Sequence, residues 1–411
     1  MQRRTVLSAI MAVSAAPLAR RARAEGAAPG VRVGVMTDMV GPYAEIGGPG
    51  SLLAARMAVE DAGSMVNGAP VEVLSGDHQN KPDVAGLIAR QWYDQDKVDI
   101  IVDVPFSTAA LVVQGIAREK KKMVIFTGAA TERLTSVDCG PTTIHYVYDT
   151  YSMANVTGKA LVALGAKSWF FVTADYVGGI ASNGAIMDVV RQSGGQILGE
   201  LRHPTNMADI SSYLLQAQAS KADAVVFSDA GQDLVNAIKQ ANEFGLVAGG
   251  QRLAAALMFM SDVRGMGLAT AQNMEMATSF YWDYDDQTRA WSKRFMARFG
   301  KAPNDNHAGV YSAVSHYLAA VQALRSTDAF EVMRWLRSNP LDDFFVRNGK
   351  LLENGRLMKD MYLAQVKTPA ESTGPDDLLR VVKVVPGDQA FRPISESVCP
   401  LVASKTTAGT K

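Results

Sequence analysis

Two loops of this chain carry hydroxyl groups that could bind a carboxylate. Ser107 and Thr108 follow an apolar stretch that ends at Val104, and Thr131 ends the loop after the next apolar stretch. The first amides of a helix have no partner within it and the helix dipole is positive there, so such positions stabilise anions. The two loops together predict a carboxylate clamp, whereas spacing alone favours Ser107 as a plain N-cap of its helix.

An earlier loop is rich in glycine and proline. It has the sequence GPYAEIGGPG and lies between a short apolar strand and a helix. It lacks the GxxxxGK[ST] phosphate loop, and its spacing and its proline do not fit GxGxxG. We therefore expect a tight turn that presents Tyr43 and backbone amides to a crevice, with a turn that binds nothing as the alternative.

The chain offers no legible catalytic or metal-binding arrangement. It contains no G-x-S-x-G, HExxH or SxxK motif. Its five histidines are scattered and its two mature cysteines do not form a CxxC pair, which does not suit a zinc site. We interpret the Asp77-His78 pair as a polar strand end. The sequence therefore predicts a protein that is not an enzyme and that uses no metal or cofactor.

Charge excludes nucleic acid as a partner class. The 411 residues include 41 basic and 41 acidic side chains, so the formal net charge is zero. A protein that binds phosphate backbones clusters Lys and Arg, and the triplet Lys120-Lys121-Lys122 is typical of a solvated helix end. The length is sufficient for two domains, each with its own core.

The first 24 residues have the features of an export signal. The pair Arg3-Arg4 precedes a short apolar stretch, and Ala22-Arg23-Ala24 fits an A-x-A cleavage site. We predict twin-arginine export to the periplasm, with the Sec route as the alternative, and a mature chain that begins at Glu25. No cysteine follows the apolar stretch, so we expect no lipid anchor.

The mature chain has two cysteines, Cys139 and Cys399. In an oxidising compartment, two cysteines most simply form one disulfide, with two buried free thiols as the alternative. A bond between them would hold the C-terminal tail against the body of the protein.

Strands and helices alternate in two successive units. The first unit has predicted strands at 31–35, 71–74, 99–104 and 123–127. The second has predicted strands at 168–173, 196–201, 224–228, 253–259 and 274–280. Three helices then follow at 287–299, 306–324 and 329–336, and a hairpin at 362–366 and 381–385. The alternation is typical of α/β proteins with doubly wound parallel sheets.

We therefore predict two Rossmann-like lobes joined by a three-strand hinge. The N-terminal lobe comprises 25–148 and 281–345, the C-terminal lobe 149–280 and 346–390, and a tail 391–411. The chain would cross between them near 147–150, 278–283 and 342–349. Such sheets bind ligands at the carboxyl ends of their strands, which places the loops described above in a cleft between the lobes.

Six motifs follow one another along the mature chain. They are VGVMTDMVGPYAEIGGPG, IVDVPFST, GAATERLT, FFVTADYVGG, NAIKQANEFGL and TSFYWDYDD. Each is weak alone, but in order and spacing the chain resembles the leucine/isoleucine/valine-type periplasmic solute-binding proteins of ABC transporters, which have the type I periplasmic-binding fold. The resemblance covers essentially the whole mature chain.

The resemblance implies a monomer that closes two lobes on a small carboxylate-bearing solute and delivers it to the permease subunits of an ABC importer in the inner membrane. It also implies site residues, by position: Ser107 as the carboxylate-binding residue, Ala129 and Thr131 as contacts of the next loop, Tyr43 as the first-loop contact, Tyr176 as the closing tyrosine, and Asp229-Ala230 as a further second-lobe contact.

One departure from the family concerns the ligand's ammonium group. Amino-acid binders of the family pair this group with a second-lobe acid, but the region Leu257–Met260 has no acid before Asp262. Asp229 could substitute for it. We therefore prefer a carboxylate without an α-ammonium group, with an amino acid bound to Asp229 as the alternative.

Aromatic residues favour an aromatic or branched solute. Phe106, Tyr281 and Trp282 would make the pocket apolar and partly aromatic, with ordinary core or hinge packing as the alternative. Two other functions remain open: a ligand-sensing receptor of the same fold, which would lack an export signal or carry an output module, and an exported hydrolase, which would need a triad.

Overall fold

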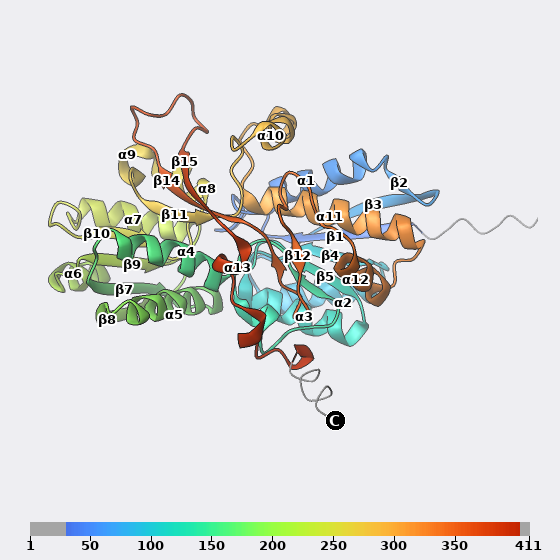
Figure 1. The fold of residues 1–411 in the computed structure, drawn as a ribbon, viewed down its shortest axis with the longest axis horizontal. Helices are drawn as coiled ribbons and strands as arrows, with labels where there is room; N and C mark the ends of the chain where they lie inside the picture. The colour runs from blue at the N-terminus through green and yellow to red at the C-terminus, as the bar shows by residue number, and fades with distance from the viewer. Residues whose placement is uncertain (1–29, 403–411) are drawn as a thin grey trace, which may run out of the picture.

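The computed structural model describes residues 30–402, and the export signal predicted for residues 1–24 lies outside the described residues. Two parallel sheets lie side by side, each flanked by helices, and a third, smaller sheet lies above the second (Figure 1). Within residues 30–402, every helix is too short or too polar to cross a membrane.

The first sheet has six strands in the order β2-β3-β1-β4-β5-β6. They are β1 (Val31–Thr37), β2 (Met65–Val66), β3 (Ala69–Asp77), β4 (Ile100–Asp103), β5 (Met123–Phe126) and β6 (Thr143–His145). All neighbouring strands pair in parallel, except that the short β2 pairs antiparallel with β3. Every residue of β4 and β5 is buried, as expected for apolar strands covered by helices on both faces.

Six helices pack with this sheet, either directly or through another helix of the group. Those that connect its strands are α1 (Gly48–Asp61), α2 (Pro82–Asp94) and α3 (Ser107–Lys120), and those from later in the chain are α10 (Asp286–Phe299), α11 (Asp305–Leu324) and α12 (Ala329–Ser338). Helix α11 lies along α1 (Figure 1). Its Val310, Val314 and Tyr317 are buried in the same core as β1. We call this group of elements the first lobe.

The second sheet has four parallel strands in the order β10-β9-β7-β8. They are β7 (Ser168–Ala174), β8 (Gln196–His203), β9 (Ala224–Ser228) and β10 (Arg252–Ala255), and their helices are α4 (Thr150–Ala163), α5 (Val177–Gln192), α6 (Ser211–Ala219) and α7 (Gln232–Glu243). Together with the third sheet, these elements form what we call the second lobe.

The third sheet corrects the prediction for residues 274–280. Strand β11 (Glu275–Thr278) does not extend the second parallel sheet but pairs antiparallel with β14 (Met361–Val366), which pairs with β15 (Leu379–Val385). Two short helices, α8 (Met260–Met266) and α9 (Leu268–Ala271), separate β11 from β10. The predicted strand 253–259 therefore ends early, at Ala255, because an apolar run such as Leu257–Met260 does not by itself indicate a strand.

We infer that the third connection between the lobes lies after the predicted 342–349. The small hairpin of β12 (Lys350–Leu351) and β13 (Leu357–Met358) still contacts the first lobe, since His145 N donates to Gly355 O at 2.9 Å. We therefore place this crossing after residue 358.

Two buried basic side chains bind the crossing segments together. Arg356 donates to Val147 O and Tyr148 O, both at 3.2 Å, and to Asp149 Oδ2 at 3.3 Å. Lys359 Nζ donates to Ser279 O at 2.7 Å. The hinge is thus a hydrogen-bonded bundle of chain segments.

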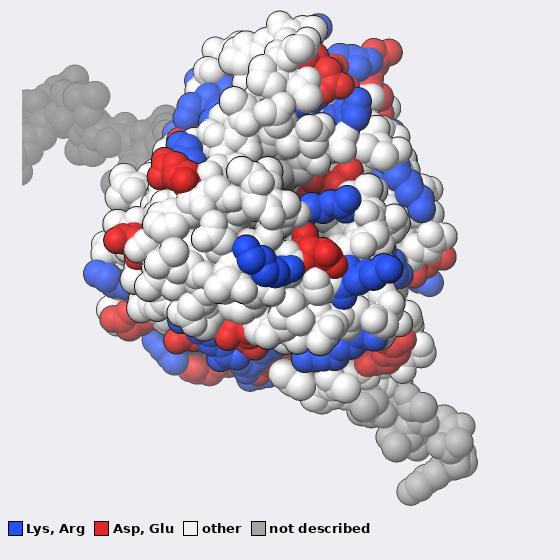
Figure 2. Space-filling model, turned by 90° about the vertical axis from the view of Figure 1, so that its left-hand side faces the viewer, with Lys and Arg blue, Asp and Glu red and all other residues white. Residues whose placement is uncertain are grey.

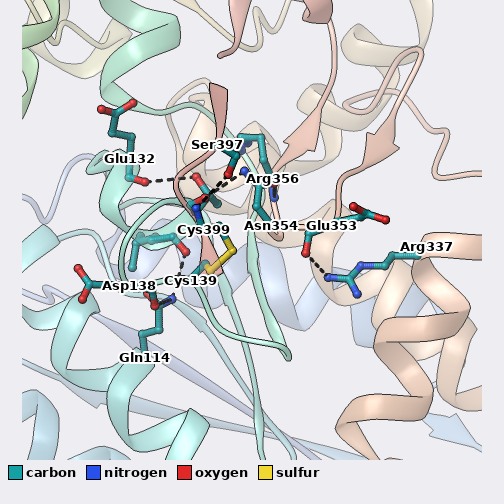
Figure 3. Close-up of a disulfide and its surroundings, with 12 residues drawn as sticks. Gln114, Glu132, Asp138, Cys139, Arg337, Glu353, Asn354, Arg356, Ser397 and Cys399 are labelled. Atoms are coloured by element: carbon teal, nitrogen blue, oxygen red, sulfur yellow. Dashed lines mark hydrogen bonds between the residues drawn. A yellow bond between two sulfur atoms is a disulfide. The ribbon is translucent and has the colours of Figure 1, made fainter. Parts of the chain in front are cut away.

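The predicted disulfide between Cys139 and Cys399 is confirmed, with the two Cα atoms 5.8 Å apart (Figure 3). The C-terminal segment first contacts the second lobe, where Asn155 Nδ2 of α4 donates to Gln389 O at 2.6 Å beside the short helix α13 (Gly387–Ala390). It then reaches the first lobe, where Cys399 is bonded. The tail is therefore a fourth link between the lobes, and the disulfide fixes its end to the first lobe.

The surface of the second lobe agrees with the neutral net charge. Figure 2 shows that basic and acidic side chains intermingle on this face, with broad uncharged areas between them. This face has no continuous basic region of the kind that binds a phosphate backbone.

Candidate functional site

A small cavity lies where loops of the two lobes meet. Its volume is about 10 Å³, about the least that can hold one water molecule. It is lined by Tyr43, Ile46, Pro105, Ser107, Gly128, Ala130 and Tyr148 of the first lobe and by Tyr176, Ala230, Leu257 and Phe259 of the second. These loops follow the carboxyl ends of parallel strands, where ligands of such sheets bind. The structure therefore describes the lobes closed on each other.

The first loop owes its shape to Asp38. Its Oδ1 accepts a hydrogen bond from Gly41 N at 2.7 Å and its Oδ2 one from Tyr43 N at 2.9 Å. The glycine-rich part that follows packs against the start of α11, where His307 Nε2 lies 3.0 Å from Gly47 O. The glycines thus allow a helix to approach the backbone closely.

The second loop presents Ser107 to the cavity. Phe106 occupies the N-cap position of α3 and makes no side-chain capping bond, so Ser107 is the first residue of the helix and not its cap. The Ser107 side chain is buried, and its Oγ accepts a hydrogen bond from Thr131 N at 3.3 Å. The second and third loops therefore meet at Ser107 and Thr131. The Thr131 hydroxyl itself accepts from Arg133 N at 3.4 Å and caps the short 3-10 turn Glu132–Thr135.

Aromatic rings from both lobes occupy the cleft. The ring centroids of Tyr43 and Phe106 lie 6.0 Å apart, and those of Phe106 and Tyr176 lie 5.9 Å apart, in stacked arrangements. Burial raises the pKa of Tyr43 well above its usual value, so its hydroxyl is neutral. Tyr43 and Tyr176 thus line the cavity, and Phe106 stacks on both rings without lining it.

Asp229 lies behind the cavity wall that its neighbour Ala230 forms. It is fully buried, and its Oδ1 lies 3.0 Å from His203 Nε2. Burial raises the pKa of Asp229, and the hydrogen bond to His203 opposes that shift. Burial also opposes protonation of His203, but Asp229 outweighs it and raises the pKa of the imidazole. Asp229 Oδ2 makes no hydrogen bond of ordinary geometry among residues 30–402, although the backbone of Ala174 lies close enough to lower the pKa of Asp229.

Ala129 and Trp282 do not reach the cavity. Ala129 O lies 2.7 Å from His145 Nε2, beneath the third loop. Trp282 Nε1 donates to Asp376 O at 2.8 Å, and the Tyr281 hydroxyl donates to Asp377 Oδ1 at 3.3 Å. Trp282 and Tyr281 thus pack at the second crossing, which was the alternative interpretation of these aromatic residues.

Two aromatic residues of the cavity, Tyr148 and Phe259, were missed from the sequence. The Tyr148 hydroxyl donates to Gly128 O at 2.9 Å, and its ring centroid lies 5.2 Å from that of Phe259. Tyr148 follows the last strand of the first sheet, so the rule that ligands bind at strand ends could have found it. Phe259 stands out in the sequence only because its segment, Leu257–Met260, lacks an acidic residue.

Comparison with known proteins agrees with this geometry. The periplasmic binding protein family matches residues 30–374. A Leu/Ile/Val-binding protein homolog 6 from Brucella melitensis is 23% identical over 241 residues, which span 58% of this chain and 61% of that protein.

Two crystal structures are more similar. A periplasmic binding protein from Burkholderia mallei is 46% identical with a TM-score of 0.88, over 90% of this chain and 99% of that chain. A branched-chain amino acid ABC transporter periplasmic ligand-binding protein from Burkholderia xenovorans is 42% identical with a TM-score of 0.82, over 90% of this chain and 100% of that chain.

Proposed function

Because the chain belongs to the periplasmic binding protein family, whose fold is that of non-enzymatic solute-binding proteins, we propose that it closes its two lobes on a small carboxylate-bearing solute for an ABC importer. The observation that carries this proposal is the cavity at the contact of the lobes, lined from both sides by loops at strand ends. We further infer that the exported protein acts in the periplasm as a monomer and delivers its solute to a permease in the inner membrane.

The carboxylate is assigned to the first lobe. Ser107 lies in the first turn of α3, whose N-cap residue Phe106 supplies no side-chain acceptor. The amides of this turn and the Ser107 hydroxyl are therefore donors for an anion. Thr131 N, which now donates to Ser107 Oγ, is a further donor within the same clamp.

We prefer a solute without an α-ammonium group, aromatic or branched in its side chain. A buried ammonium without an acidic partner costs several kcal/mol, even after relaxation. The second-lobe residues at the cavity, Tyr176, Ala230, Leu257 and Phe259, are uncharged, and Asp229 Oδ1 is engaged with His203. The rings of Tyr43, Phe106 and Tyr176 suit a flat or branched apolar group.

An amino acid is the second candidate, and one observation favours it. Asp229 Oδ2 is buried and has no donor within hydrogen-bond geometry among the described residues, so an ammonium group could supply that donor. The Burkholderia xenovorans relative, described as a branched-chain amino acid transporter component, points in the same direction.

A calorimetric titration distinguishes the two candidates. Phenylalanine and leucine are compared with their 2-oxo and deamino analogues, using the exported wild-type protein. We expect the acids without an ammonium group to bind more tightly, by about a hundredfold or more if several kcal/mol separate the two classes.

Asp229→Asn is the matched variant for this comparison. It keeps the shape of the side chain and removes its charge, so it should leave the preferred acids bound. Micromolar binding of the amino acids alone, abolished by Asp229→Asn, would contradict the preference and establish the second candidate.

A further inference from the structure

The backbone is in an unusual conformation just before the Ser107 loop. Asp103 and Val104 have φ angles of +84° and +57°. Side chains other than glycine rarely enter this region, and a β-branched residue such as Val104 is strained there. Such strain persists only where surrounding contacts fix it, and it concentrates at ligand sites.

The Asp103 carboxylate lies beneath the second and third loops of the site. It is fully buried, and its Oδ1 accepts hydrogen bonds from Asn306 Nδ2 at 2.9 Å and from Thr127 Oγ1 at 3.4 Å. Thr127 opens the third loop and Asp103 itself opens the second. Burial raises the pKa of Asp103, and the hydrogen bonds, led by that of Asn306, oppose the shift.

The first loop reaches the same carboxylate. Asn306 Nδ2 also lies 3.1 Å from Ile46 O, within hydrogen-bond geometry. A Cβ on Gly47 would lie 2.8 Å from Asp103 Oδ2, and a Cβ on Gly128 of the third loop would lie 2.9 Å from Oδ1. Because these separations are too short for a carbon atom, glycine at both positions lets the loops close on the carboxylate.

We propose that Asp103 is a positioning residue of the ligand site, which sets the spacing of the loops that carry Tyr43, Ser107 and Ala130 without touching the ligand. The inference rests on the proposed function, since it concerns the same cavity. Glycine would adopt the backbone conformation of position 103 with less strain, so the aspartate is explained by what its carboxylate holds. A binding site needs such support because small displacements of its donors weaken it.

Asp103→Gly tests this role. The variant removes the carboxylate and relieves the backbone, so the melting temperature of the ligand-free protein should change little. The Kd for the tightest-binding acid of the phenylalanine and leucine set should rise about tenfold or more, since the donors of the clamp are no longer held. Asp103→Asn keeps an acceptor for Asn306 and tolerates positive φ, so it should largely restore binding.

Asn273→Gly is the control, because it relieves another positive φ, +65°, away from the cavity, and it should leave the Kd unchanged. Wild-type affinity in Asp103→Gly would overturn the inference, as would a loss of affinity that Asp103→Asn does not restore. A wild-type protein that binds none of these acids or amino acids would overturn the proposed function and this inference with it.

Discussion

Ser107 lines the cavity as the first residue of α3, after the N-cap Phe106. We predict that Ser107→Ala weakens binding of the carboxylate solute about tenfold or more, because one hydrogen bond to a charged group is worth about 1.5–3 kcal/mol. The melting temperature should hardly change, since the hydroxyl does not cap the helix. Calorimetry and thermal unfolding of the same samples measure both quantities.

Thr108→Ala is the matched control for this prediction. Thr108 is the next residue of α3 and does not line the cavity, so its loss should leave the affinity unchanged. If Ser107→Ala keeps the wild-type affinity but melts at a lower temperature, the residue is structural.

Single residues also show where sequence reasoning stops. Ser107 and Tyr43 could be placed at the cleft because each follows a parallel strand at its carboxyl end, whereas Tyr176 was implied only by the resemblance to the family. Trp282 was considered only for its aromatic ring, and its indole Nε1 donates to Asp376 O at the second crossing. A residue type suggests a chemistry, but its side chain reaches the cleft only if the residue lies in a loop after the carboxyl end of a parallel strand.

At the scale of elements, the hinge segments carry a buried lysine. Lys359 follows β13, is almost fully buried, and places its ammonium 4.0 Å from the ring centroid of Phe345. Burial lowers the pKa of Lys359 to about 7, although nearby carboxylates such as Asp305 oppose the shift. An unfolded chain has a lysine pKa of about 10.4. Between these values the unfolded state binds more protons, so this lysine makes stability rise with pH.

We therefore predict a pH-dependent effect of Lys359→Met. The free energy of unfolding of the wild type, minus that of the variant, should increase from about pH 7 to about pH 10. Urea unfolding over this range measures it, with Lys383→Met as the control because Lys383 lies exposed on β15. A difference that stays constant with pH would show that Lys359 keeps its charge in the folded protein.

Elements of regular period were the most predictable part of the fold. The helices and strands of both parallel sheets follow the alternation of the sequence, because each buried strand is a short apolar run between helical patterns. Strand β11 has the same apolar character but pairs antiparallel with β14, which lies more than eighty residues later. The local pattern of apolar residues does not indicate which distant strand will pair with it.

At the scale of the whole molecule, closure depends on contacts between the lobes as well as on the hinge. Gly231 is the N-cap residue of α7 in the second lobe with a φ of +59°, and a Cβ there would lie 2.4 Å from Pro42 O of the first lobe. This clash is with backbone, which cannot rotate away. The two-lobe architecture is predictable from the sequence, but this contact is not, because it exists only when the lobes meet.

We predict that Gly231→Ala disfavours the closed protein. Overpacking a close contact costs about 1–3 kcal/mol, which corresponds to a loss of solute affinity of about tenfold or more. Small-angle scattering with saturating solute should also give a larger radius of gyration than for the wild type.

Gly245→Ala is the control, because its φ is +74° and nothing lies within 4 Å of the added Cβ. Both variants should lose some stability through the positive φ, but only Gly231→Ala should lose affinity. Equal affinities in the two variants would show that the lobes close without the contact between Gly231 and Pro42.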